Sequence, residues 1–260
     1  MSDAVTAAVL LIGDELLSGR TQDTNLRSIA EFLAPIGVEI CEARVVPDDH
    51  DTIVSTVRHL SAAWSYVFST GGIGPTHDDI TADAMAAAFR RTISVRQDAV
   101  DQLRKHYGQR AQGQDINESR LRMARIPEGA SLILNPVSGA PGFQIENVFV
   151  MAGVPSVMRG MLQDIGHRLA GGSVVLAKTV RGRTMKEGDI ASALGEIAKS
   201  WPTVSIGSYP WMRPGGAAGP DYGVNLVARS RNAEALSGAF NELIALVRSQ
   251  NIEPETDPQD

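Results

Sequence analysis

The sequence has only one cysteine, Cys41, among its 260 residues. A disulfide within the chain and a zinc site built from cysteines are therefore excluded, and the reducing cytoplasm is the expected location. A lone cysteine in such a protein commonly serves as a small apolar side chain. We expect Cys41 to have that role in a strand.

Positive charge and long apolar runs are also scarce. The chain has 24 Lys and Arg against 30 Asp and Glu, which gives a formal net charge of −6. Because a nucleic-acid binder needs a basic surface that neutralises phosphates, no nucleic-acid partner is expected. The apolar stretch at residues 7–12 is too short to cross a bilayer and no basic residue precedes it, so neither a membrane partner nor a targeting segment is expected.

Three common catalytic or nucleotide-binding motifs are missing. The sequence contains no G-x-x-x-x-G-K-[ST], no G-x-G-x-x-G and no G-x-S-x-G. A Walker-type NTPase, a standard Rossmann dehydrogenase and an α/β-hydrolase are therefore not expected. The 5 histidines include no pair at the spacing of metal ligands, and His77, the one in a candidate loop, is expected on the surface.

The residues that are present predict a folded α/β protein. Hydrophobic residues make up 43% of the chain, enough to form a core. Strand and helix patterns alternate through a first domain, residues 1–170, and predict a mostly parallel sheet with helices on both faces. Strands are expected at residues 5–12, 38–46, 66–69, 132–134 and 148–151, and helices at 25–35, 47–60, 80–89 and 155–169.

Two later segments have different patterns. Residues 90–125 are more polar and predict two exposed helices, at 96–107 and 117–123, in an insertion or lid. Residues 171–252 predict a small α+β domain, because the order of strands and helices changes after two glycines. The acidic tail, residues 253–260, is expected to be frayed.

The densest chemical signal is the segment T-G-G-I-G-P-T-H-D-D at residues 70–79. Gly71, Gly72 and Gly74 let the backbone turn sharply and bring its N–H groups close to an anion, and the following helix adds its N-terminal N–H groups. Asp78 and Asp79 would repel a phosphate unless a divalent cation lay between them, so the segment indicates Mg²⁺-assisted phosphate chemistry. The alternative is that these aspartates only cap the helix.

Further polar residues follow other predicted strands. Asp48 comes after the second strand and is the first candidate for a metal ligand, with helix capping as the alternative. Gly13, Glu15 and Ser18 occupy the turn after the first strand. Because the carboxyl ends of parallel strands meet at one edge of the sheet, we expect these residues to lie near the glycine-rich segment.

A third group of candidates surrounds the later strands. Gly139 and Gly142 belong to a glycine- and proline-containing segment that ends at Phe143, which is expected to be a core residue. The turn with Gly153, Pro155 and Ser156 should expose N–H groups at a helix start. This turn suits a second phosphate or the ring edge of a substrate.

Six segments together resemble a known family: I-G-D-E-L-L-S-G-R-T-Q-D-T-N (12–25), V-V-P-D-D (45–49), T-G-G-I-G-P-T-H-D-D-I-T (70–81), M-A-R-I-P-E-G-A (123–130), N-P with A-P-G-F (135–143) and A-G-V-P (152–155). They resemble the amino-terminal part of competence/damage-inducible protein A, CinA, of the molybdopterin-binding, MoaB/Mog-like superfamily. Residues 174–247 resemble the smaller companion domain found in stand-alone members and in the hydrolase half of eukaryotic FAD synthases.

The resemblance implies both a function and a site. It places the acids needed for Mg²⁺-dependent chemistry on Asp48 and Asp79, both as metal ligands and as catalytic groups, with Mg²⁺ or another divalent cation such as Co²⁺. It implies hydrolysis of a pyrophosphate link in a molecule of the ADP-ribose or FAD class, and a dimer or trimer. Residues expected to bind ligand phosphates are Gly13, Glu15, Ser18, Gly71, Gly72, Gly74, Thr76, Asp78, Gly139, Gly142, Gly153, Pro155 and Ser156.

Two alternatives remain at this point. One is a protein of molybdenum cofactor biosynthesis that binds a pterin phosphate or transfers an adenylyl group to it. The other is a regulatory module that binds such a ligand without turnover, because Val157 stands where related proteins commonly carry a glutamate. All three hypotheses share a phosphorylated small molecule, an adenine dinucleotide or a pterin phosphate, as the partner.

Overall fold

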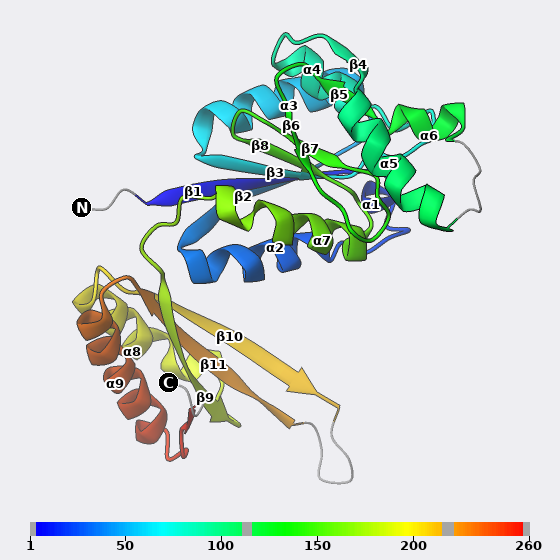
Figure 1. Cartoon of the computed structure of the whole chain (residues 1–260). Helices are drawn as coiled ribbons and strands as arrows, with labels where there is room; N and C mark the ends of the chain where they lie inside the picture. The colour runs from blue at the N-terminus through cyan, green and yellow to red at the C-terminus, as the bar shows by residue number, and fades with distance from the viewer. Residues whose placement is uncertain (1–3, 111–115, 215–220, 257–260) are drawn as a thin grey trace. The chain divides into compact units, whose positions relative to one another are not determined.

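A computed structural model describes residues 4–110, 116–214 and 221–256 of the chain. The chain divides into two compact units, the first ending at Ser173 and the second beginning at Val174. Each unit has its own sheet and its own helices (Figure 1).

The first unit is built on a mostly parallel sheet, as the sequence predicted. The strand order is β2-β1-β3-β8-β7-β6, in which β1, β2, β3 and β8 run parallel while β7 and β6 are antiparallel to their neighbours. The strands are β1 (Val5–Ile12), β2 (Val38–Val46), β3 (Tyr66–Thr70), β6 (Ser131–Ile133), β7 (Gly142–Ile145) and β8 (Val148–Met151).

Helices cover both faces of this sheet. Figure 1 shows α3 and α4 on one side and α2 and α7 on the other. Successive residues of β1 point to opposite faces, so Leu10 packs in one core and Leu11 in the other. The helices are α1 (Asp14–Leu17), α2 (Asn25–Leu33), α3 (His50–Ala63), α4 (Thr81–Ala88) and α7 (Pro155–Ile165), with short 3-10 turns at Ala34–Ile36 and Gly166–Arg168.

Local sequence explains where several of these elements begin. Asp49 is the N-cap of α3, because its carboxylate accepts hydrogen bonds from the N–H and hydroxyl of Thr52. Pro155 begins α7, where its missing N–H leaves no helical hydrogen bond unmade. Gly37 adopts a left-handed conformation, φ 73°, and so ends the turn before β2.

The prediction that residues 90–125 form exposed helices is wrong for the first of them. Helix α5 (Gln97–Arg110) packs Ala99 and Leu103, both 0% exposed, into the core shared with α3 and α4. These side chains form a narrow apolar stripe in an otherwise polar helix. The segment also contains α6 (Glu118–Arg122) and a two-stranded sheet of β4 (Ile93–Val95) and β5 (Arg125–Pro127), which the sequence did not predict.

Strand β7 was also not predicted. The glycine- and proline-containing segment before Phe143 turns directly into this strand, which pairs antiparallel with β8. Gly142 lies inside the strand, where a Cβ atom would collide with the Val150 carbonyl oxygen. Phe143 is buried in the core, as predicted.

The second unit is a small α+β domain, as predicted. Its sheet has the order β10-β11-β9-β12, all antiparallel, and α8 and α9 lie on one face of it (Figure 1). The core contains Val180, Leu226 and Phe240. The elements are β9 (Leu176–Arg183), α8 (Glu187–Ser200), β10 (Ser205–Arg213), β11 (Asp221–Ser230), α9 (Ala233–Ser249) and β12 (Glu255–Thr256).

Part of the acidic tail is ordered, contrary to the expectation that residues 253–260 are frayed. Glu255 and Thr256 form β12 and pair with Arg181 and Val180 of β9. Two ion pairs join Glu255 to arginines of β9, at 2.7 Å for Arg183 and 3.9 Å for Arg181. The last four residues, 257–260, lie outside the described part of the chain.

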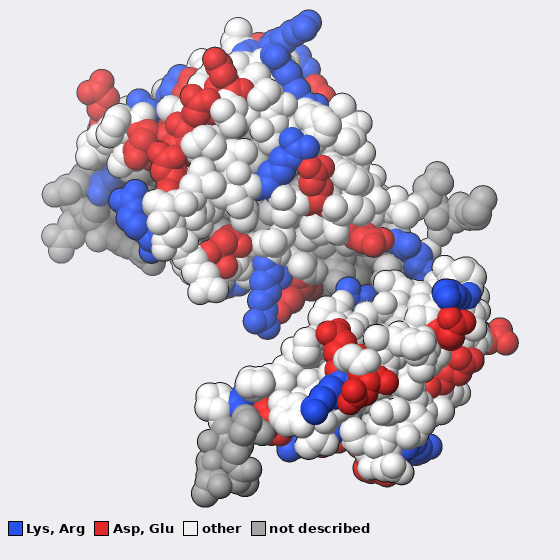
Figure 2. All heavy atoms as spheres, turned by 180° about the vertical axis from the view of Figure 1, so that it is seen from behind, with Lys and Arg blue, Asp and Glu red and all other residues white. Residues whose placement is uncertain are grey.

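The surface carries charges of both signs. On the face seen in Figure 2, the described lysine and arginine side chains are interspersed with acidic ones and form no continuous basic patch. Cys41 lies in β2, an edge strand of the first sheet, and is exposed rather than buried. No helix in the described ranges is both long enough and apolar enough to span a membrane.

Candidate functional site

The glycine-rich segment forms the turn between β3 and α4 in a conformation that only glycine adopts easily. Gly71 and Gly72 have φ values of 109° and 65°. A Cβ atom on Gly71 would collide with the Ile12 carbonyl oxygen, and one on Gly72 with the Thr81 hydroxyl. The lack of side chains therefore lets this turn pack against the end of β1 and the start of α4.

Three successive backbone N–H groups of this turn are available to a ligand. Within the described residues, the N–H groups of Gly72, Ile73 and Gly74 donate to no protein acceptor. The neighbouring N–H groups are used: Gly71 donates to Met151, and Thr81 donates back to Gly72. Successive unbonded amides of this kind form an anion-binding concavity.

A second turn, between β8 and α7, lies against the first. A Cβ atom on Gly153 would be 3.4 Å from the Cα atom of Gly71. The Gly153 carbonyl accepts a 2.7 Å hydrogen bond from the side-chain amide of Asn25, which is only 5% exposed and begins α2. In the described part of the chain, the N–H groups of Gly153 and Val154 also have no acceptor.

The two turns enclose a cavity of about 380 Å³. It brings together residues that the sequence placed in three separate groups: Glu15, Gly71, Gly72, Gly74, Asp79 and Gly153. Its remaining wall is mostly apolar and includes Ile73, Met123, Val157 and Met161. The combination of free amides, carboxylates and an apolar wall suits a phosphorylated ligand with a flat ring.

Asp79 is held inside the loop by Thr76. Its Oδ2 atom accepts hydrogen bonds from the backbone N–H of Thr76, at 2.8 Å, and from the hydroxyl of the same residue. The carboxylate lies beside Gly74, where a Cβ atom would be 2.6 Å from Oδ2. The Thr76 hydroxyl also lowers the pKa of Asp78. Both Thr76 and Asp78 are exposed, and neither lines the cavity.

Asp48 approaches the same turn from β2. Its Oδ2 atom accepts a 3.0 Å hydrogen bond from the N–H of Asp14, and its Oδ1 atom would lie 3.5 Å from a Cβ atom on Gly72. Burial raises the pKa of Asp48, the Asp14 N–H lowers it, and repulsion from Glu15, Asp14 and Asp78 raises it again, so the net pKa is above its ordinary value. The alternative that Asp48 caps α3 is wrong, because Asp49 has that role.

The carboxylates near the glycine-rich turn are too few to hold Mg²⁺ by themselves. Within the described ranges, no three His, Cys, Asp or Glu side chains are grouped closely enough to hold a metal ion. Mg²⁺ commonly keeps several water ligands and is held by one or two carboxylates together with substrate phosphates. Asp48 is repelled by Glu15, Asp14 and Asp78, and a cation would relieve this repulsion. These residues therefore fit a Mg²⁺ site in which water and substrate oxygens complete the coordination.

Several predicted residues lie outside the cavity. Ser18 and Ser156 are exposed, Gly13 is buried at the end of β1, and Pro155 is half-buried at the start of α7. Gly139 is buried against His106 and lines a different cavity, and Gly142 lies within β7. None of these six residues therefore lines the cavity at the glycine-rich turn.

Sequence reasoning missed two residues near this cavity. Arg122 borders a narrow crevice that Asp79 and Gly72 also line, and its Nε atom is buried with no hydrogen-bond partner among the described residues. Asn25 ties α2 to the second turn. Asn25 is the last residue of the first segment that resembles CinA, so a signal for it was present, whereas the proximity of Arg122 depends on how α6 packs.

Comparison with known proteins identifies the two units. Residues 8–171 match the family described as Probable molybdopterin binding domain, and residues 178–256 match the family described as FAD synthase, middle domain. A protein of Archaeoglobus fulgidus is 34% identical over 209 residues, which are 80% of this chain and 86% of that protein.

Two further relatives are CinA-like. A CinA-like protein of Gemmatimonas aurantiaca is 32% identical over 253 residues, or 93% of this chain, which spans only 57% of that relative. The crystal structure of the protein CinA with unknown function from Thermoplasma acidophilum matches with a TM-score of 0.58 and 35% identity, covering 64% of this chain and 99% of that one. The resemblance to CinA-like proteins is thus confirmed, and the chain belongs to the family of probable molybdopterin binding domains, with a domain similar to the middle domain of FAD synthase following it.

Proposed function

We propose that this chain hydrolyses the pyrophosphate bond of a nucleotide-linked small molecule of the ADP-ribose or FAD class. The observation that carries the proposal is the cavity at which two sets of unbonded N–H groups, at residues 72–74 and 153–154, lie beside the carboxylates of Asp79 and Glu15. Backbone amides of this kind bind phosphate. Two sets in one cavity suit a ligand with two linked phosphates.

The apolar wall would receive the ring of such a ligand. Ile73, Met123, Val157 and Met161 line the cavity next to the amides. A flat adenine or flavin ring would bury apolar surface there while its phosphates face the two turns. The match of residues 178–256 to the middle domain of FAD synthase supports a nucleotide-related ligand.

Asp48 and Asp79 are the residues that would hold a divalent cation, Mg²⁺ or another such as Co²⁺. When bound, the cation would neutralise part of the pyrophosphate charge, which otherwise repels an attacking water. The protein's own contribution is to place the carboxylates and amides before the substrate arrives, so that little reorganisation is needed during the reaction.

In the proposed reaction, water cleaves the bond between one phosphorus and the bridging oxygen of the pyrophosphate. A water oxygen forms a bond to one phosphorus, the bond from that phosphorus to the bridging oxygen breaks, and the bridging oxygen leaves on the other phosphate. A proton of the water passes to a carboxylate of the site and then to solvent. ADP-ribose would give AMP and ribose 5-phosphate, and FAD would give AMP and FMN.

One incubation series tests this proposal. The purified full chain is mixed with ADP-ribose, with FAD, or with ATP and molybdopterin, each with and without Mg²⁺ or Co²⁺, and the products are identified by mass spectrometry. AMP release from a dinucleotide only when the cation is present is the expected result. No AMP release from either dinucleotide under any of these conditions would contradict it.

A role in molybdenum cofactor biosynthesis is the second candidate. It is favoured by the match of residues 8–171 to a family described as molybdopterin binding. The same apolar wall and amides suit a pterin phosphate, and formation of adenylylated pterin in the ATP series would support this function instead.

A binding module without turnover is the third candidate. Val157 is buried in the wall of the cavity, where it offers no carboxylate. Binding of ADP-ribose or FAD without any product would favour this candidate.

We also propose that the chain forms a dimer or trimer, as the resemblance implies. Analytical ultracentrifugation of the full chain would give the assembled mass. A purely monomeric protein at micromolar concentration would contradict this part of the proposal.

A further inference from the structure

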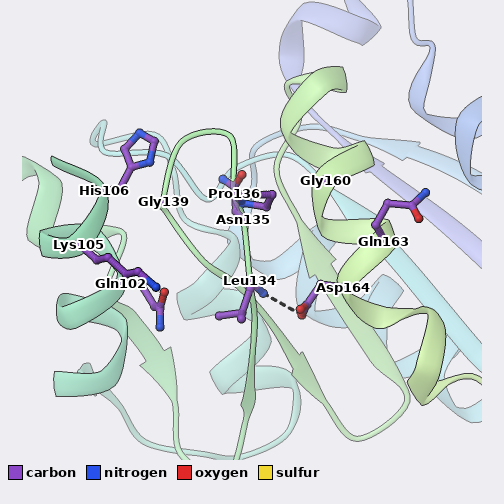
Figure 3. Close-up of a pocket in the computed structure, with 10 residues that line it drawn as sticks. All are labelled: Gln102, Lys105, His106, Leu134, Asn135, Pro136, Gly139, Gly160, Gln163 and Asp164. Atoms are coloured by element: carbon purple, nitrogen blue, oxygen red, sulfur yellow. Dashed lines mark hydrogen bonds between the residues drawn. The ribbon is translucent and has the colours of Figure 1, made fainter. Parts of the chain in front are cut away.

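A second and larger cavity lies in the first unit, away from the glycine-rich turn. It has a volume of about 560 Å³ and lies between α5, α7 and the loop that follows β6 (Figure 3). Cavities of roughly 300–1,000 Å³ commonly hold small-molecule ligands. None of the roles proposed above uses this cavity.

One wall of the cavity carries a cation without a protein partner. Lys105 and Gln102 extend from α5 across the cavity toward Leu134 (Figure 3). Among the described residues, neither side chain forms an ion pair or a hydrogen bond. An ammonium group and an amide in this arrangement are free to bind a phosphate and the polar edge of a ring.

Among the described residues that line the cavity, the one carboxylate already has partners within the protein. Asp164 of α7 accepts a 2.9 Å hydrogen bond from the N–H of Leu134, which Figure 3 marks, and pairs with Arg168 at 3.2 Å. Its charge is therefore balanced within the protein. An anion bound at Lys105 would meet little net repulsion from this side.

The remaining surface is apolar and suited to a ring. Leu134 is 43% exposed although it directly follows a core strand, and Pro136 is exposed beside it. Gln163 of α7 also lines the cavity, but its side chain points away from Lys105 (Figure 3). A cation, the Gln102 amide and an apolar patch in one cavity suit the phosphate, the polar edge and the ring of a nucleoside monophosphate.

The two cavities share a single loop. Asn135, which is 6% exposed, organises this loop by donating to the Ala140 carbonyl at 3.0 Å and accepting from the N–H of Val137 at 2.9 Å. Ser138 and Ala140 line the cavity at the glycine-rich turn, whereas Asn135, Pro136 and Gly139 line the second cavity. The sites are therefore distinct but adjacent.

We infer that the cavity between α5 and α7 is a second binding site, for a nucleoside monophosphate, with Lys105 as the phosphate-binding residue. This site does not depend on the proposed hydrolysis. A ligand there would touch the same loop that borders the glycine-rich turn.

Methyl NMR of the full chain titrated with AMP tests the inference. The Leu134 methyl groups report on the second cavity, and the Val157 methyl groups report on the cavity at the glycine-rich turn. AMP should shift the Leu134 resonances in the wild-type protein. Lys105→Ala should weaken that response about tenfold or more, because a charge-assisted contact is lost.

A matched control lies one residue away on the same helix. Arg104 is half exposed and approaches Asp101 at 4.0 Å, so Arg104→Ala removes a cation without changing the cavity lining and should leave AMP binding unchanged.

Shifts of the Val157 resonances alone, or an equal response in Lys105→Ala and the wild type, would overturn the inference. Inorganic phosphate or adenosine binding as tightly as AMP would likewise overturn the assignment to a nucleoside monophosphate. The titration measures binding and needs no turnover, so its result is independent of the result of the hydrolysis experiment.

Discussion

A single substitution of Asp79 distinguishes the effect of its charge on activity from the effect of its hydrogen bonds on the fold. In Asp79→Asn the side chain keeps an oxygen that accepts from Thr76 but loses its negative charge. We expect cation-dependent AMP release to fall about 100-fold or more while the fold is retained, since groups that stabilise charge in a transition state have effects of that order. Rates of AMP release and circular dichroism measure the two effects.

The control for this variant is Asp51→Asn. The side chain of Asp51 is 97% exposed on α3 and pairs with the neighbouring His50, so activity should be unchanged. Full activity of Asp79→Asn would remove Asp79 from the mechanism.

Gly72 is the residue at which a side chain should do most harm to ligand binding. Gly72→Val would place a branched side chain at φ 65° and drive it into the Thr81 hydroxyl. The strain costs about 1–3 kcal/mol and should displace the neighbouring N–H groups, so affinity for ADP-ribose should fall. Calorimetric titration measures this, with Gly195→Ala on α8, where a Cβ atom meets open space, as the control. Unchanged affinity would show that the turn does not contact the ligand.

At the scale of elements, α5 is part of the core rather than a detachable lid. Leu103 is 0% exposed and packs with residues of α3 and α4. Leu103→Ala should therefore destabilise the first unit by about 2–5 kcal/mol. Hydrogen exchange of the β1 and β3 amides measures this, and Arg104→Ala on the exposed side of the helix should change little. A loss below about 1 kcal/mol for Leu103→Ala would indicate that α5 detaches from the core.

Helix α9 begins with an asparagine N-cap, Asn232. The Asn232 side chain accepts hydrogen bonds from the N–H groups of Glu234 and Ala235, both at 3.0 Å. Asn232→Ala should reduce the stability of the second unit by about 1 kcal/mol, because two donors lose their acceptor. Chemical unfolding followed by hydrogen exchange in α9 checks this value. Ser237→Ala, further along the same helix, should have a much smaller effect, and equal effects would argue against capping as the cause.

At the scale of the whole chain, the first unit contains everything that its core requires. Both apolar clusters that sandwich its sheet are made of residues before Ser173. We expect a fragment of residues 1–173 to unfold cooperatively and to bind ADP-ribose with the affinity of the full chain. Calorimetry on the fragment and the full chain tests both points. A fragment that folds but does not bind would mean that the second unit contributes to the site.

Elements with a strong local pattern were predictable from the sequence. The runs at 5–12, 38–46 and 148–151 form strands with those same bounds, because they are continuous apolar or alternating stretches between glycine, proline or polar turns. The glycine-rich turn was also predictable, because three glycines within four residues mark a place where the backbone can turn sharply. The buried face of α5 was not predictable, because it shares its core with residues of α3 and β1 that are distant in the sequence. Strand β7 was missed although its partners β6 and β8 are near it in the sequence, because it is only four residues long and begins with a glycine.

The sequence also did not distinguish the roles of similar residues. Asp48 and Asp49 are adjacent carboxylates after one strand, yet Asp49 caps α3 while Asp48 turns toward the Asp14 N–H. Likewise Gly142 and Gly153 look equivalent in the sequence, but one fits inside a strand and the other lines the cavity. The path of the backbone at each position decides whether a residue caps a helix, lies in a strand or lines the cavity. That path depends on how the elements pack against one another.

The sequence by itself determined most of the strands and helices of the two main sheets, the CinA-like family and the positions of the glycine turns, because each of these is encoded by residues close together in the chain. Only the tertiary structure decided which turns share a cavity, which carboxylate is held by Thr76 and which repels its neighbours, and that Lys105 faces a second cavity. The physical reason is that contacts, burial and repulsion depend on distances between segments, and folding sets those distances through the packing of the sheet and its two helical layers.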